Sequence, residues 1–219
     1  MNGSKLVADC RACVLMMITI VLFLGGCGEK ARTPDQIMAQ AMQERDKGGY
    51  SAAIIHLKNL LQKSPDHPEA RFLLGETYMD AGNPALAETD LRRALELGFD
   101  QTKVIPALGK SLLMMGQFQK VLDNVRLEGE SDNQVQAKIL TLRALATIGL
   151  NRRAEGRQLL EQALAKQPEF SDALLVQARL EAGEKKSAEA ARLIERALAS
   201  TPKSIEAWML KGDLGRMKA

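Results

Sequence analysis

Apolar residues follow two different patterns along the chain, and the change between them lies near residue 27. Between Val14 and Leu24 the apolar run is unbroken by charge. From residue 34 onward, small and apolar residues instead recur at a fixed period among charged ones. The pattern predicts a short N-terminal targeting segment followed by a body built from internal repeats.

The period of the second pattern is about 34 residues. Ala53 and Ala87 are one such period apart, and the same spacing separates Leu57 from Leu91. It also separates the members of three further sets: Ala41, Gly75 and Gly109; Gly48, Gly82 and Gly116; Ala144, Ala178 and Gly212. The step from Gly109 to Ala144 exceeds the period by one, so a single residue is inserted in the irregular stretch "LEGESDNQ".

This period, with its small residues, loop glycines and late prolines, resembles the tetratricopeptide repeat. The stretch "ARFLLGETYMDAGNPALAETDLRRALELG" carries the key positions in order. The resemblance implies an all-α solenoid, a right-handed superhelix of helix pairs. Gly75 and Ala87 would let the two helices of a pair approach closely, and Gly82 would supply the left-handed backbone that ends the first helix.

The repeat register predicts five full repeats and part of a sixth. We expect the five (residues 34–204) near 34–67, 68–101, 102–136, 137–170 and 171–204, with a partial sixth over 205–219. Two positions depart from the pattern. Asn151 stands where the fourth loop would prefer glycine, and Pro106 lies inside a predicted helix, early enough to cost only a local distortion.

The first pattern predicts a signal rather than a membrane span. Its apolar run is about half of the roughly 20 residues that a spanning helix needs. Lys5 and Arg11 precede it, and Leu24-Gly25-Gly26-Cys27 follows, which resembles the lipobox of bacterial lipoproteins. By that resemblance residues 1–26 form a lipoprotein signal peptide, Cys27 is lipidated, and 27–33 form a lipidated tether. A retained anchor and an ordinary buried thiol are the alternatives.

Composition and the two histidines narrow the functional classes. The chain has 30 Lys and Arg against 27 Asp and Glu, interspersed rather than clustered, so no nucleic-acid partner is expected. Aromatic residues make up only 4%, which favours helix over strand. His56 and His67 have no cysteine or carboxylate at metal-ligand spacing. We therefore expect no enzyme activity, no metal and no cofactor.

The resemblance to the tetratricopeptide repeat implies that the first helices line a concave groove, the face with which that family usually binds peptides. The repeat register places the following residues there: Met42, Arg45, Phe72, Glu76, Met79, Lys103, Lys110, Leu113, Met114, Lys138 and Thr141. Met38, Leu145 and Arg179 continue the same surface. Methionine adapts to varied partners, and the lysines suit an acidic peptide or an anionic polymer. Met and Leu at helical spacing more often pack between repeats, and single lysines usually only solvate a face, so these alternatives stay open beside the groove.

The wording of the first repeats resembles a narrower family. The stretches "AAIIHLKNLLQKSPDHPEARFLLGETY" and "VIPALGKSLLMMGQF" resemble the TPR-repeat lipoproteins of the PEP-CTERM/exosortase system, whose members are longer, so the chain resembles an N-terminal part of one. That resemblance implies a scaffold in exopolysaccharide-associated protein export and sorting.

The same resemblance implies a place in the cell. It implies an outer-membrane lipoprotein that faces the periplasm, held in the membrane by the Cys27 lipid. Its expected partners are envelope proteins or peptides, with an anionic polysaccharide as a second candidate. A pilus- or outer-membrane-assembly lipoprotein and the recruitment arm of a longer enzyme are the alternatives.

Overall fold

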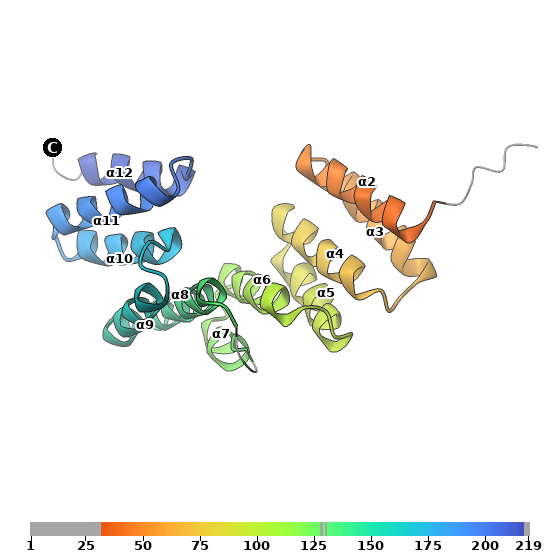
Figure 1. Ribbon diagram of the computed structural model, residues 1–219, viewed down its shortest axis with the longest axis horizontal. Coiled ribbons are helices and arrows are strands. Elements are labelled where there is room, and N and C mark those ends of the chain that lie inside the picture. Colours follow the sequence, from red (N-terminus) through yellow and green to blue (C-terminus); the bar gives the residue numbers. More distant parts are fainter. Residues whose placement is uncertain (1–31, 128, 130, 217–219) are drawn as a thin grey trace, which may run out of the picture. The chain divides into compact units, whose positions relative to one another are not determined.

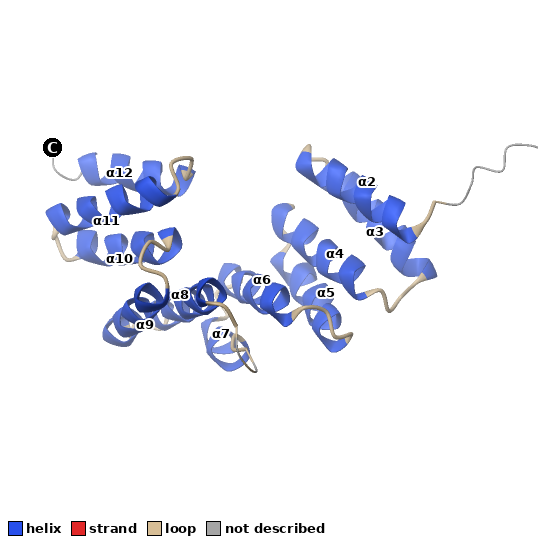
Figure 2. Ribbon diagram, in the orientation of Figure 1, coloured by secondary structure: helices blue, strands red, loops and turns tan. Residues whose placement is uncertain are grey.

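The computed structural model describes residues 32–127, 129 and 131–216. Within them the chain forms eleven helices and no strand (Figure 1, Figure 2). The predicted signal peptide, Cys27 and most of the tether lie outside the described residues, as do residues 217–219. The chain divides into residues 1–36 and 37–219.

The helices come in consecutive pairs, which makes the body a solenoid of helix pairs as predicted. The pairs are α2 (Pro34–Asp46) with α3 (Tyr50–Lys63), α4 (Pro68–Asp80) with α5 (Pro84–Glu96), α6 (Gln101–Met114) with α7 (Phe118–Asn124), α8 (Asn133–Gly149) with α9 (Arg153–Lys166), and α10 (Ser171–Gly183) with α11 (Ser187–Ser200). The last described helix is α12 (Ile205–Arg216). The predicted repeat boundary at residue 137 falls inside α8, whose start is capped by Asp132.

Side-chain caps set several helix starts. Thr33 and Gln36 exchange hydrogen bonds at the start of α2: the Thr33 amide donates to Gln36 Oε1 at 3.0 Å, and the Gln36 amide donates to Thr33 Oγ1 at 3.3 Å. This reciprocal pair is a capping box. The Val135 amide donates to Asp132 Oδ1 at 2.8 Å, and His67 Nδ1 accepts from the Ala70 amide at 3.3 Å. His67 therefore serves as a helix cap.

The turn inside each pair needs one residue with positive φ. Gly82 has φ 74° at the turn between α4 and α5, which confirms the left-handed backbone predicted there. Asn151 takes φ 63° at the same place in the fourth pair, a conformation that asparagine tolerates better than most residues. Lys185 takes φ 62° in the fifth pair, one repeat period after Asn151, which the sequence pattern had not singled out.

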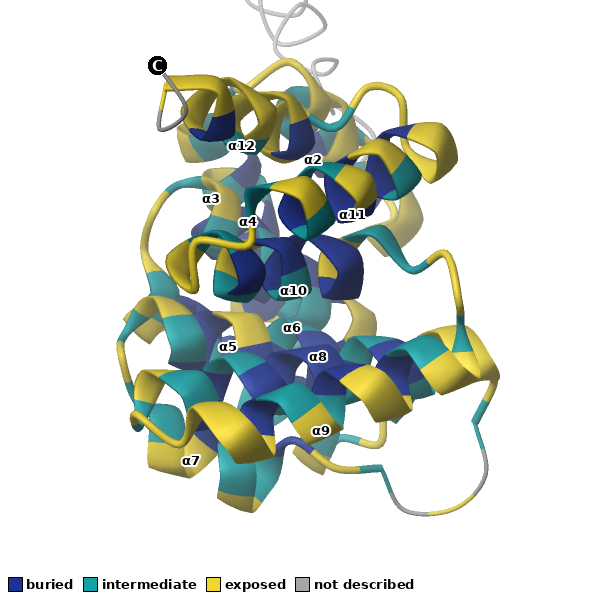
Figure 3. Cartoon of the chain, turned by 90° about the vertical axis from the view of Figure 1, so that its left-hand side faces the viewer, coloured by how far each residue is buried: buried dark blue, intermediate teal, exposed yellow. Residues whose placement is uncertain are grey.

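The core lies between successive helices rather than at one centre. Buried residues form three consecutive clusters, one from α2 into α8, one over α8 to α10, and one over α10 to α12. In Figure 3 the buried positions recur along α8, α10 and α11 between exposed stretches. Each pair is thus stabilised by its neighbours in the array.

Small residues let the helices pack closely within this core. A Cβ atom on Gly75 would lie 2.7 Å from Leu91 Cγ and 3.4 Å from the Ala87 carbonyl oxygen. Gly75 therefore makes room for the Leu91 side chain as well as for the Ala87 backbone. Pro106 lies within α6, which continues through it to Met114, so the proline does not end the helix.

Candidate binding groove

A cavity of about 330 Å³ opens across the first helices of successive pairs. Its lining combines apolar and charged side chains: Met79 of α4; Lys110, Leu113 and Met114 of α6; Lys138, Thr141, Leu142 and Leu145 of α8; Asp172, Val176 and Arg179 of α10; and Glu206 of α12. Residues spaced three or four apart lie on one face of a helix, which explains how α6 and α8 each supply several of them. We call this surface the first-helix groove.

The groove brings together six of the eleven residues predicted to line it. Met79, Lys110, Leu113, Met114, Lys138 and Thr141 all face this one cavity. Met114 keeps 57% of its surface exposed, so it is available for contact rather than spent on packing between repeats. Thr141 is only 3% exposed, and its Oγ1 donates to the Ala137 carbonyl at 2.8 Å. The Thr141 hydroxyl is therefore already used.

Two lysines give one part of the groove an unbalanced positive charge. Neither Lys110 nor Lys138 has a hydrogen bond or an ion pair within the part of the chain that the structure describes. Partial burial lowers the pKa of Lys138, and the neighbouring Lys110 charge lowers it further, while Asp172 and Glu76 act in the opposite direction. A bound anion would offset the repulsion between the two ammonium groups.

The charge along the groove reverses toward the last helices. Asp172 lies one repeat period after Lys138, and Glu206 lies one period after Asp172, so all three occupy the same repeat position. Arg179 Nη2 lies 2.7 Å from Glu206 Oε1, and this ion pair neutralises that region locally. Sequence reasoning had missed both acidic residues, although extending the repeat register from Lys138 would have found them.

Two residues predicted to line the groove, Arg45 and Glu76, pair with each other beside a smaller cavity of about 170 Å³ that shares Met79 and Lys110 with the groove. Arg45 Nη1 lies 2.9 Å from Glu76 Oε2, and Arg45 Nε lies 2.5 Å from Asp80 Oδ2. Partial burial alone would lower the pKa of Arg45, but the Asp80 hydrogen bond and the two carboxylate charges raise it overall. Arg45 and Glu76 therefore tie the first repeat to the second and do not offer free charges to a ligand.

Phe72, Lys103 and Met42 lie outside the lining of the cavity. The Phe72 ring stacks on Phe99 with centroids 4.9 Å apart, and Lys103 Nζ lies 5.8 Å from the Phe99 centroid. Phe99, just before α6, was not among the predicted residues; its place in "LELGFD" is the only signal the sequence offers. Met42 is 51% exposed on α2.

The described residues contain no group of three or more His, Cys, Asp or Glu residues placed to hold a metal ion. Within the same ranges, every helix is too short or too polar to cross a bilayer. What the groove offers to a ligand is adaptable apolar side chains beside two ammonium groups, those of Lys110 and Lys138.

Comparison with known proteins decides the family. The tetratricopeptide repeat model matches residues 44–110 and 148–214, which together make up more than half of the chain. The chain belongs to the tetratricopeptide repeat family. Members of this family are typically non-enzymatic scaffolds that bind protein or peptide partners. The interval 111–147, which holds α7 and most of α8, lies between the two matched stretches.

Individual relatives are distant. The chain is 26% identical over 151 residues to the TPR repeat-containing protein YpiA of Bacillus subtilis, which covers 69% of this chain but only 34% of that protein. The structure of TTC0263 from Thermus thermophilus has a TM-score of 0.64 at 18% identity and covers 83% of this chain and 98% of that one. The structure of pilF from Pseudomonas aeruginosa has a TM-score of 0.62 at 16% identity and covers 84% and 83%. At these identities the two structures show a shared fold alone.

Proposed function

We propose that this tetratricopeptide repeat chain is a membrane-anchored scaffold that binds an envelope protein through its first-helix groove. The observation that carries the proposal is the pairing of Lys110 and Lys138, both without an ion pair among the described residues, with the exposed Met114 in one cavity. An extended peptide suits this site, because it can place an apolar side chain on the methionines and a carboxylate on the lysines.

The expected cellular role is exopolysaccharide-associated export and sorting of PEP-CTERM proteins. Two features support this role: the amino-acid sequence of the first three repeats, and the lipobox-like Leu24-Gly25-Gly26-Cys27. Lipidation of Cys27 would hold the groove at a membrane surface, and Gly28 after the cysteine favours the outer membrane. An anionic polysaccharide stays a second candidate ligand for the two lysines.

Site-specific photocrosslinking in cells tests the groove. Met114 and Ile55 are equally exposed, at 57% each, but Met114 lines the cavity whereas Ile55 lies on α3, a second helix. A photoreactive phenylalanine analogue at Met114 should crosslink a discrete protein partner, and the same analogue at Ile55 should not. Adding Lys138→Glu should abolish the Met114 crosslink. Equal crosslinking from both positions would contradict the groove assignment.

Acyl labelling tests the membrane anchor separately. The wild-type chain should incorporate labelled fatty acid and sediment with the membrane fraction, and Cys27→Ala should do neither. If Cys27→Ala still takes up label, the lipobox assignment is wrong, whatever the crosslinking shows.

One comparison favours a second candidate, a pilus-assembly lipoprotein. The likeness to pilF covers more than four fifths of both chains, although it concerns the fold alone. Deletion of the gene separates the two roles. The first predicts that PEP-CTERM proteins fail to be sorted while pili assemble normally, and the second predicts the reverse.

A further inference from the structure

The second helix of the third pair is half as long as its counterparts. Helices α3, α9 and α11 have 14 residues each and α5 has 13, whereas α7 has 7. At about 1.5 Å per residue, the seven missing residues leave roughly 10 Å of helix unbuilt. Between Val125 and the start of α8, the described residues 125–127, 129 and 131–132 form no helix.

Side chains hold the short helix at this end. Arg143 Nη1 of α8 donates to the carbonyls of Leu122 and Val125, at 3.1 and 3.3 Å. Arg126 Nε and Nη2 donate to the Asp123 carbonyl at 3.0 and 2.7 Å. These bonds satisfy the carbonyls that the end of a helix leaves without intrahelical partners. The early end of α7 is therefore a built feature of the fold.

The missing turns would lie along the first half of α8. A Cβ on Gly149, at the end of α8, would lie 2.7 Å from the Phe118 ring at the start of α7. Arg143, further toward the start of α8, contacts the end of α7. The two helices thus run in opposite directions, and a longer α7 would continue past Leu140 and Gln136.

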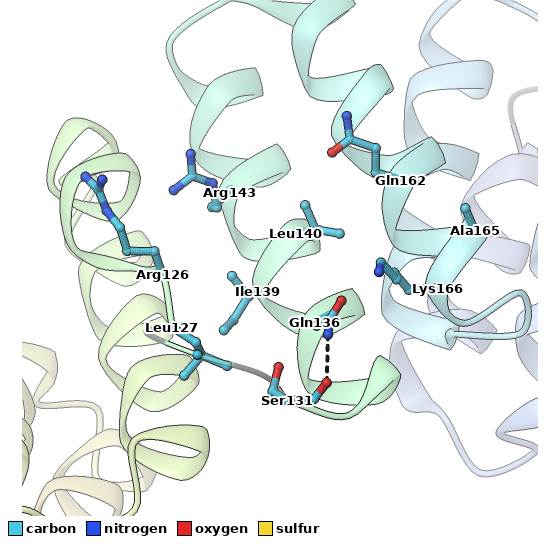
Figure 4. Close-up of a pocket in the computed structure, with 11 residues that line it drawn as sticks. Arg126, Leu127, Ser131, Gln136, Ile139, Leu140, Arg143, Gln162, Ala165 and Lys166 are labelled. Carbon is cyan, nitrogen blue, oxygen red and sulfur yellow. Dashed lines mark hydrogen bonds between the residues drawn. The ribbon is translucent and has the colours of Figure 1, made fainter.

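A cavity of about 720 Å³ occupies this place. It is lined by Arg126, Leu127, Gly129, Ser131, Gln136, Ile139, Leu140, Arg143, Gln162, Ala165 and Lys166. Figure 4 shows these side chains coming from the end of α7 and the following loop, from α8, and from the last turns of α9. None of them lines the first-helix groove. We call this surface the α7 gap.

The α7 gap has an apolar floor and a cationic rim. Leu127, Ile139, Leu140 and Ala165 supply the apolar surface, and Arg126, Arg143 and Lys166 supply three positive charges. No carboxylate is among the described lining residues. The carbonyls at the end of α7 carry only about half an elementary charge in total, so among the described lining residues most of the positive charge stays unbalanced.

We propose that the α7 gap binds a short, acidic, amphipathic helix of a partner protein, which completes the third repeat in place of the missing turns. Because α7 is seven residues shorter than α9, the gap has the length of a helix of about two turns. The apolar floor selects leucine-like residues on one side of that helix. The rim selects aspartate or glutamate beside them, by charge complementarity. This second interface does not depend on the first-helix groove.

Binding of a defined peptide to the purified full chain tests the proposal. The probe is a fluorescein-labelled 14-residue peptide of leucine, alanine and glutamate, with leucine at every third or fourth position, and fluorescence anisotropy reports its binding. Lys166→Glu replaces an attraction with a repulsion at an exposed position and should weaken binding about fivefold or more. Ala165→Phe, also at an exposed position of α9, should fill the gap and weaken binding at least as much.

Matched controls separate the gap from other surfaces. Arg153→Glu makes a comparable change of charge at an exposed position in the first turn of α9, outside the cavity, and should leave binding unchanged. Glu128→Gln with Glu130→Gln, two positions that precede Ser131 in the sequence, should not weaken binding. Melting curves should show that all the variants are folded.

Several results would overturn the proposal. One is a peptide affinity that neither Lys166→Glu nor Ala165→Phe reduces. Another is equal binding of a peptide with lysine in place of glutamate, and a third is a loss caused by Lys138→Glu rather than by the α9 variants. If the chain self-associates and Ala165→Phe abolishes that association instead, the occupant is a second copy and the proposed partner helix is wrong.

Discussion

In both the second and the third helix pair, a branched apolar side chain packs against a glycine. The two pairs differ in whether that side chain belongs to the second helix. In the second pair, Leu91 within α5 fills the space over Gly75 of α4. In the third, the residue one period after Leu91 is Val125, and its Cγ2 would lie 3.0 Å from a Cβ on Gly109. Val125 already lies beyond the end of α7. Val125 thus packs against Gly109 as Leu91 packs against Gly75, although α7 ends at Asn124, one residue before Val125.

The two pairs also differ in their buried charges. Arg71 Nη1 of α4 lies 2.7 Å from Asp90 Oδ1 of α5. The third pair has Ile105 and Asn124 at the corresponding positions, one period further along the chain. Asn124 instead donates from Nδ2 to the Lys120 carbonyl at 2.8 Å. Both pairs keep the packing of a larger side chain against a glycine. The length of the second helix and the ion pair between the helices differ between them.

The largest expected effect comes from filling the small position. Gly75→Ala should lower the free energy of unfolding by about 1–3 kcal/mol, because its Cβ would overlap the buried Leu91 side chain. Gly109→Ala should cost less, since its contacts with Val125 and Leu142 are 3.0 to 3.2 Å. Chemical denaturation of both variants measures the order.

Gly212 is the matched control for this prediction. It occupies the same repeat position on α12, where a Cβ would meet nothing within 4 Å. Gly212→Ala should therefore stabilise its helix by up to about 1 kcal/mol. If both substitutions lower the free energy of unfolding equally, crowding between the two helices of a pair is not the cause of the loss at Gly75.

The next effect tests what holds the short helix in place. Arg143→Met should destabilise the chain by about 1–2 kcal/mol, since it removes both bonds that a charged group makes to the end of α7. Amide hydrogen exchange should speed up most at residues 118–125. Arg126→Met, at an exposed position, should have a smaller effect. If exchange in α7 is unchanged in Arg143→Met, the helix end does not depend on this residue.

A smaller effect tests the turn that both pairs share. Gly82 and Gly116 have φ 74° and 67°, so the turns of the two pairs agree while their second helices differ. Lys185 has φ 62° at the same position of the fifth pair. Lys185→Gly should therefore stabilise the chain by about 0.5–1 kcal/mol, which thermal melting can detect. Asn151→Gly should gain less, and a loss of stability in Lys185→Gly would contradict the shared geometry.

The smallest effect concerns the other side of α8, which faces the first-helix groove. Burial and the nearby Lys110 charge lower the pKa of Lys138 in the folded chain, so the unfolded chain binds the proton more tightly. The penalty is fully present at neutral pH and is lost as pH rises through the folded pKa toward the unfolded value. Lys138→Met removes this penalty and should raise the free energy of unfolding at neutral pH. The gain should be only a few tenths of a kcal/mol, because solvent screens this half-exposed group.

Its pH dependence is the sharper measurement. The gain in melting temperature of Lys138→Met should shrink as the pH approaches about 10.4, the ordinary value for lysine. A gain that is constant from neutral to alkaline pH would show that added apolar packing, not charge, is responsible. Lys110→Met shows whether removing the neighbouring charge gives part of the same gain.

The sequence by itself determined the period, the helix pairs and the turns. Gly75 and Ala87 at fixed spacing define the seam, and Gly82 marks the turn, because each acts through its own size or its own backbone freedom. The same register brought Met79, Lys110, Leu113, Met114, Lys138 and Thr141 into one cavity, since equivalent positions on stacked helices face the same side.

Only the tertiary structure decided which of these side chains are free and where the array departs from its pattern. Arg45 meets Glu76 and Asp80 at separations of 31 and 35 residues, and Arg143 meets Leu122 at 21. Such contacts depend on how neighbouring pairs approach, which no local pattern encodes. For the same reason the sequence "LEGESDNQ" does not predict the α7 gap. The gap depends on the positions of α8 and α9 and on the early end of α7.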